Sequence, residues 1–84
     1  MKFYCICVYG RVHGVGFRYA VMNAALKHGL FGTVRNTNDG VEIIVNDKDF
    51  FEKVKLSGFA RIDERTIEEL DLPKFQYKDF RIIG

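Results

Sequence analysis

The chain has 84 residues, of which 48% are hydrophobic, with eight phenylalanines, four tyrosines and no tryptophan. This length fits one domain, residues 1–84, because half of it would be too short to bury a core, and the apolar share allows that core to form without disulfide bonds. The net charge is only +2, with 13 basic and 11 acidic residues interleaved along the chain. This balance argues against a nucleic-acid partner, which favours positive charge gathered on one face.

The first predicted element is a central β-strand, Lys2–Tyr9, whose residues are apolar on both alternating faces. Cys5 and Cys7 point to the same side of it at about the upper limit of disulfide geometry, so we expect unbridged, buried thiols that act as small hydrophobic residues. A single C-x-C is a weak metal motif, and we expect no metal site. The segment shows neither a signal-peptide pattern nor a membrane-spanning one, which predicts a reduced, cytoplasmic protein without membrane association.

A helix and a hairpin follow. Apolar residues recur at helical spacing over Phe17–His28, and Gly29 is a good left-handed terminator with Leu30 placed to fold back over it. Residues 31–37 and 41–45 are rich in β-formers, and the Asn-Asp-Gly between them tolerates positive φ. These two segments are predicted to pair as a hairpin.

A second, short helix is predicted next. Asn46 or Asp47 can cap it, and it is expected to end near Gly58. Its predicted buried side consists of the apolar residues Phe50, Phe51 and Val54.

The last third of the chain is predicted to be extended. Ala60–Leu70 favours an edge strand over a third helix, and Phe75–Ile83 is expected to form the last strand after the break at Pro73. The order βαββαβ, with one possible additional strand, predicts an α+β, ferredoxin-like sandwich. Its sheet would be mostly antiparallel, with two helices on one face.

The segment GRVHGVGFR, Gly10–Arg18, carries the chemistry. Gly10, Gly14 and Gly16 remove Cβ atoms where successive N–H groups can converge on an anion, and the following helix N-terminus adds further donors. Arg18 can place a planar set of donors against tetrahedral oxygens. The loop therefore predicts a phosphate site, although it lacks the Lys-Ser/Thr pair of a nucleotide-binding P-loop, and a glycine turn with a surface arginine is the alternative.

The segment Gly10–Arg18 resembles the first signature of the acylphosphatases, and GTVRNTNDG, Gly32–Gly40, resembles the second. The downstream stretches VEIIV, FEKV and ARID lie where that family has its third strand, second helix and fourth strand. The resemblance thus covers essentially the whole chain.

This resemblance implies a hydrolase that splits a small acyl phosphate into a carboxylate and inorganic phosphate, without metal or cofactor. It implies that Asn36 positions the attacking water. It also implies a phosphate-binding set formed by His13, Gly14, Val15, Gly16, Phe17 and Arg18. We expect a monomer whose only partner is its substrate.

Some residues depart from the family pattern. His13 replaces the usual glutamine, Thr33 replaces an aromatic residue, and the turn at Asp39–Val41 is one residue short. The compact turn and the ARID stretch resemble the N-terminal domain of the hydrogenase maturation carbamoyltransferases. A non-catalytic phosphate- or partner-binding domain is therefore the alternative function, and RNA binding on an open sheet face is a third.

Two further groups of polar residues are predicted to be solvated. Arg35 would point to the sheet face opposite Asn36. The acidic residues Glu68, Glu69 and Asp71 are expected to form a solvated edge and not a metal cluster.

Overall fold

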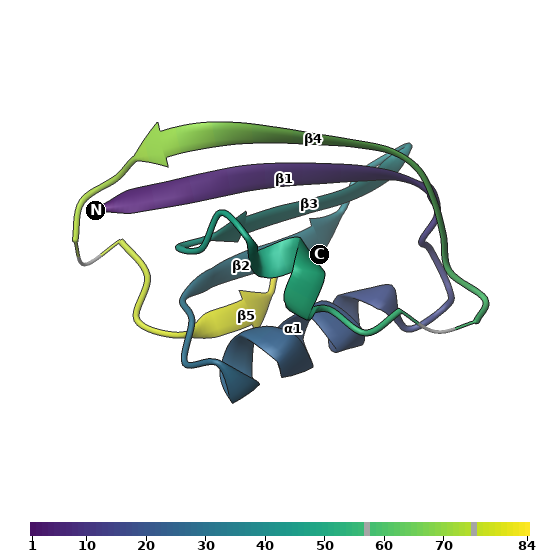
Figure 1. Ribbon diagram of the computed structural model, residues 1–84, viewed down its shortest axis with the longest axis horizontal. Helices are drawn as coiled ribbons and strands as arrows, with labels where there is room; N and C mark the ends of the chain where they lie inside the picture. The colour runs from purple at the N-terminus through teal and green to yellow at the C-terminus, as the bar shows by residue number, and fades with distance from the viewer. Residues whose placement is uncertain (57, 75) are drawn as a thin grey trace.

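Five strands form one sheet, and the helical elements lie against a single face of it (Figure 1). The computed structural model describes residues 1–56, 58–74 and 76–84. The elements in chain order are β1 (Lys2–Arg11), α1 (Phe17–Lys27), β2 (Gly32–Asn36), β3 (Gly40–Val45), the 3-10 helix η1 (Phe50–Lys53), β4 (Arg61–Asp71) and β5 (Phe80–Ile82).

The strand order across the sheet is β4-β1-β3-β2-β5. Neighbouring strands are antiparallel except β2 and β5, which are parallel. β1 and β3 therefore occupy the interior of the sheet, as the two-sided apolar pattern of β1 predicts. The ferredoxin-like class is confirmed, and the segment predicted as an edge strand is the edge strand β4.

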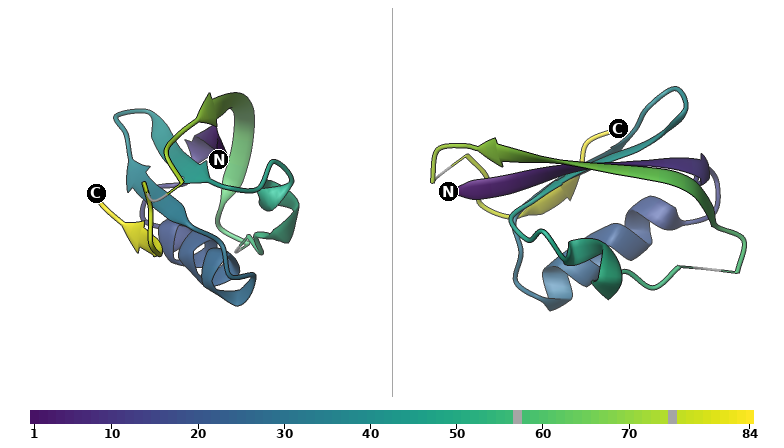
Figure 2. Two further views of the ribbon diagram at one scale, coloured as in Figure 1. Left: turned by 90° about the vertical axis from the view of Figure 1, so that its left-hand side faces the viewer. Right: turned by 45° about the horizontal axis from the view of Figure 1, so that its top comes forward.

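The core lies between the sheet and α1 (Figure 2, right). Ile6 and Val8 of β1 and Ile43 of β3 point into it and are at most 1% exposed. Phe17 and Val21 of α1 cover them from below. Each such side chain contributes about 1.5–3 kcal/mol through its removal from water, so this one layer supplies most of the driving force for folding.

Helix α1 ends as its sequence predicts, one residue earlier than expected. Gly29 has a φ of 65°, and the N–H of Leu30 donates to the carbonyl oxygen of Ala25 at 2.9 Å. This reversal satisfies a carbonyl group that the helix end would otherwise leave unpaired.

The predicted second helix is wrong: the segment forms only the four-residue η1. The Asp47 side chain accepts a hydrogen bond from the Asp49 N–H and forms an ion pair with Lys53. These two contacts close a local turn in place of a helix cap. Phe50 and Val54 are buried, as predicted, and Phe51 is partly buried, but only Phe50 of the buried pair lies within η1. This is too little burial to propagate an α-helix, whose first turn is costly to form. One face of the sheet thus carries one α-helix and one 3-10 turn.

The last strand is shorter than predicted. β5 covers only Phe80–Ile82, because β2 offers a ladder only from Gly32 onward, and the predicted start at Phe75 lies outside the described residues. In the preceding loop the ring of Tyr77 packs edge-on against Phe3, with ring centroids 5.2 Å apart. The loop therefore covers one end of the sheet instead of extending it.

Gly32 is expected to be the glycine whose replacement unfolds the chain most readily. Its φ is 144°, and a Cβ there would lie 1.7 Å from the carbonyl oxygen of Ile44 on the paired strand. We expect Gly32→Ala to lower the free energy of unfolding by roughly 3 kcal/mol, because the β2–β3 ladder must open to admit the methyl group. Urea unfolding followed by circular dichroism measures this. Gly58→Ala, where a Cβ meets no atom within 4 Å, is the matched control, and equal loss in both variants would contradict the steric argument.

Candidate functional site

The glycine loop connects β1 to α1 and lies at the surface. Gly14 and Gly16 have φ values of 69° and 74°, and a Cβ on either would meet no atom within 4 Å. Their requirement for glycine is therefore conformational and not steric. Among the described residues, the N–H groups of Gly14, Gly16 and Phe17 make no hydrogen bond to a backbone carbonyl group. The first helical bond runs from Ala20 to Gly16 at 3.1 Å, so these donors lie at the positive end of α1 without a partner inside the helix.

Arg18, in the first turn of α1, reaches the end of the chain. Its guanidinium donates to the main-chain oxygen of Gly84. The same oxygen accepts the backbone N–H of Asn36 at 3.1 Å. The two residues predicted to form the site, one on α1 and one on β2, thus meet at a single oxygen.

Asn36 is the last residue of β2. Its side chain shares the core-facing side of the strand with Val34, which is fully buried. The Asn36 Oδ1 atom is buried, and no described group donates a hydrogen bond to it. A buried acceptor left in this state costs about 1–3 kcal/mol, which a turn of the carboxamide toward a donor would offset.

Arg35 points to the opposite face, as predicted. Its Nε and one terminal nitrogen donate to the two carboxylate oxygens of Glu42 at 3.0 and 3.2 Å. Arg35 and Asn36 are adjacent in the chain but serve different faces of the sheet, so only Asn36 belongs with Arg18.

His13 links the glycine loop to the hairpin. Its Nε2 lies 2.6 Å from the carbonyl oxygen of Gly40, at the start of β3. A carbonyl oxygen only accepts hydrogen bonds, so Nε2 carries a proton and donates it. His13 thereby fastens the loop to the β2–β3 turn close to Asn36. This contact supports the expectation that histidine can hold the loop in place of glutamine.

Gly84 is the residue of the candidate site that the sequence did not indicate. The segment after β5 continues the parallel pairing with β2, since the Ile83 N–H donates to the Val34 carbonyl oxygen at 2.9 Å. No motif marks this segment, and a glycine contact made through a main-chain oxygen leaves no side-chain signal. Only the pairing of β5 beside β2 could have placed it near Asn36.

The remaining candidates lie elsewhere. Glu68, Glu69 and Asp71 are exposed along the outer strand β4, which fits the predicted solvated edge. Cys5 and Cys7 are free, as predicted, but they are half-buried and not buried. Burial, and next the charge of Cys7, raises the pKa of the Cys5 thiol to about 12. Among the described residues, no helix is both long and apolar enough to cross a membrane.

Comparison with known proteins agrees with this geometry. A sequence profile described as Acylphosphatase matches residues 4–82. An acylphosphatase of Bacillus pumilus (strain SAFR-032) is 42% identical over 92 aligned positions, covering all of both chains.

Solved structures give the same result. The crystal structure of acylphosphatase from Bacillus subtilis superposes with a TM-score of 0.87 and 35% identity over the full length of both chains. The crystal structure of full-length HypF, in its phosphate- and nucleotide-bound form, superposes with a TM-score of 0.84 and 34% identity. This match covers 99% of this chain but 12% of the HypF chain. This chain thus matches acylphosphatases over their full length and HypF over a small part of its length. On the sequence profile and these relatives together, the chain belongs to the acylphosphatase family.

Proposed function

We propose that this acylphosphatase hydrolyses small acyl phosphates with Arg18 and the loop amides of residues 13–17 holding the phosphoryl group and Asn36 orienting the attacking water. The observation that carries the proposal is the shared Gly84 oxygen. It draws the Arg18 guanidinium and the backbone of Asn36 to one point beside the glycine loop. This contact supports a site made of the loop amides, the Arg18 cation and the Asn36 carboxamide.

Phosphoryl binding follows from the donors present. Arginine has five N–H donors, so Arg18 can keep its bond to Gly84 and still present others to phosphoryl oxygens. The amides of Gly14, Gly16 and Phe17 and the α1 dipole add fixed positive potential. Because phosphoryl transfer depends mainly on alignment and on stabilising charge on the equatorial oxygens, this set is sufficient for the chemistry.

Water activation needs only orientation. The Asn36 Oδ1 is buried and has no partner among the described residues; when the carboxamide turns outward, this oxygen can accept a hydrogen bond from a water and hold it in line with the phosphorus–oxygen bond that breaks. The leaving group is a carboxylate with a pKa of about 4, which departs as an anion without a general acid. The water gives one proton to a phosphate oxygen as the products form, so no strong base is required.

The cellular setting is inferred from the cysteines and from the distribution of charge. We infer a single domain over residues 1–84 that acts as a cytoplasmic monomer on a small substrate, without nucleic acid. The two free thiols support a reducing compartment. The interleaved charges support the absence of a nucleic-acid partner.

A non-catalytic phosphate-binding domain is the second candidate. It is favoured by the match to 12% of the HypF chain and by the presence of His13 in place of glutamine. Such a domain would bind inorganic phosphate and leave acyl phosphates intact.

One assay separates these two candidates. Purified chain is mixed with acetyl phosphate or benzoyl phosphate in excess EDTA, and phosphate release is followed alongside a calorimetric titration with inorganic phosphate. Turnover well above an Arg18→Ala/Asn36→Ala double variant is expected. A folded protein that binds phosphate without turnover would establish the binding domain and overturn the enzymatic proposal.

A further inference from the structure

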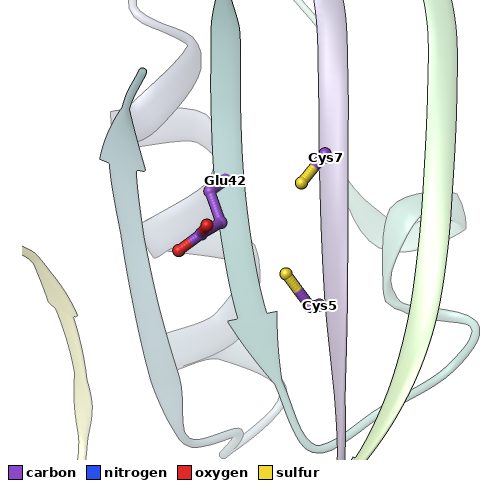
Figure 3. Close-up of side chains that lie close together, drawn as sticks. All are labelled: Cys5, Cys7 and Glu42. Carbon is purple, nitrogen blue, oxygen red and sulfur yellow. The ribbon is translucent and has the colours of Figure 1, made fainter.

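Three metal-ligating side chains gather on the sheet face away from α1. Cys7 of β1 lies directly opposite Glu42 of β3 in the antiparallel register, and Cys5 is two residues earlier on the same face. One ligand atom from each lies within 4.8 Å of the others. Figure 3 shows the two sulfur atoms on the β3 side of β1. We propose that Cys5, Cys7 and Glu42 bind one Zn²⁺ ion.

The spacing fits a tetrahedral ion after a small adjustment. Zinc binds sulfur at about 2.3 Å and carboxylate oxygen at about 2.0–2.2 Å, so its donors lie roughly 3.5–3.8 Å apart. The three atoms must close in by about 1 Å, within the reach of side-chain rotation. A strand rise of about 3.3 Å per residue puts the two cysteine Cα atoms near the upper limit for a disulfide. A bridging cation can span that separation.

Arg35 orients the oxygen ligand, and the carboxylate of Glu68 offsets the positive charge of Arg35. Arg35 holds both Glu42 oxygens, at 3.0 and 3.2 Å, and a carboxylate has lone pairs left to bind a metal. This arrangement matches the hydrogen bonds that usually support metal ligands. Glu68 lies opposite Cys5 in the β1–β4 register and adds negative charge on the other side. On binding, each thiol releases its proton to the solvent, and water takes the fourth position.

The donor set points to zinc among the common ions. Calcium and magnesium require six or more oxygen ligands or retained waters, and thiols do not suit them. Copper(I) also selects thiolates but has no preference for a carboxylate. Two sulfurs and one carboxylate oxygen in a half-buried site match the borderline-soft character of Zn²⁺.

The site is independent of the proposed phosphate site, because Asn36 faces the core and Glu42 the opposite side. Phosphate release in EDTA is therefore expected to proceed without the bound ion. Failure of the zinc proposal leaves the hydrolase proposal intact, and the reverse also holds.

The test is direct metal binding to the reduced full-length protein. Titration with Co²⁺ is expected to give thiolate-to-cobalt charge-transfer absorption that saturates at one ion per chain and disappears on addition of Zn²⁺. Competition with a chromogenic chelator then gives the zinc affinity. We expect Cys5→Ser and Cys7→Ser each to weaken it at least about 100-fold and Glu42→Gln about 10-fold or more.

Glu64→Gln is the matched control. Glu64 is exposed on β4 and lies opposite Tyr9, on the same sheet face as the cluster. It is not one of the three proposed ligands, so the zinc affinity of the Glu64→Gln variant should equal that of the wild type. Circular dichroism of each variant verifies the fold. Unchanged affinity in either cysteine variant, unchanged affinity in Glu42→Gln, or tight binding of Cu⁺ without Zn²⁺ would each overturn the proposal.

Discussion

Replacing Arg18 by alanine is expected to lower kcat/KM for acetyl phosphate about 10³-fold or more, since a cation on the equatorial oxygens of a transferred phosphoryl group contributes on that scale. Affinity for inorganic phosphate should fall as well, because the guanidinium binds the phosphoryl group in both the ground state and the transition state. The loss separates into a raised KM and a lowered kcat in steady-state kinetics. Arg18→Lys should recover only part of the rate, because a single ammonium cannot reproduce the planar set of donors.

A matched arginine isolates the effect. Arg81 of β5 pairs with Asp79 at 2.9 Å, and its side chain is 73% exposed. Arg81→Ala removes the same charge and is expected to leave kcat/KM within about twofold, as surface substitutions usually do. Similar losses in Arg18→Ala and Arg81→Ala would mean that net charge, and not a specific contact, sets the rate.

Most of the fold was predictable because the pattern of buried residues repeats with the period of each element. The two-sided apolar run of β1 indicated a central strand, and the spacing from Phe17 onward indicated a helix. The second helix failed because apolar spacing over so few residues cannot distinguish an α-helix from a 3-10 turn. In this segment the contacts of Asp47 with Asp49 and Lys53 determine the backbone conformation.

The candidate site was predictable only where side chains carry its proposed chemistry. Glycines at positive φ, an arginine after them and an asparagine at a strand end are visible in the sequence. The main-chain oxygen of Gly84 is not, although it connects Arg18 to Asn36. Cys5 and Cys7 show the same limit. Their spacing was visible, but their proximity to Glu42 depends on the register between β1 and β3, which no local pattern encodes.

Replacing Asn36 by alanine is expected to lower kcat about 10²-fold while KM and phosphate affinity change less than about twofold. A water that loses its orientation costs a factor of this size even when the substrate is bound correctly. The backbone bond from Asn36 to Gly84 at 3.1 Å does not need the side chain, so the position of Arg18 is retained. Steady-state kinetics and phosphate titration of the same preparation give both quantities.

Two further variants sharpen this prediction. Thr37→Ala alters the next residue, whose structural contact is a backbone bond from its N–H to Gly40 at 2.8 Å, and should leave kcat within about twofold. Asn36→Asp keeps an oxygen acceptor but places a negative charge beside the phosphoryl group, so it should raise KM as well as lower kcat. The expected contrast is thus a KM that stays constant in Asn36→Ala and rises in Asn36→Asp. An Asn36→Ala variant that loses phosphate affinity as strongly as Arg18→Ala would show that the carboxamide binds the phosphoryl group and does not direct the water.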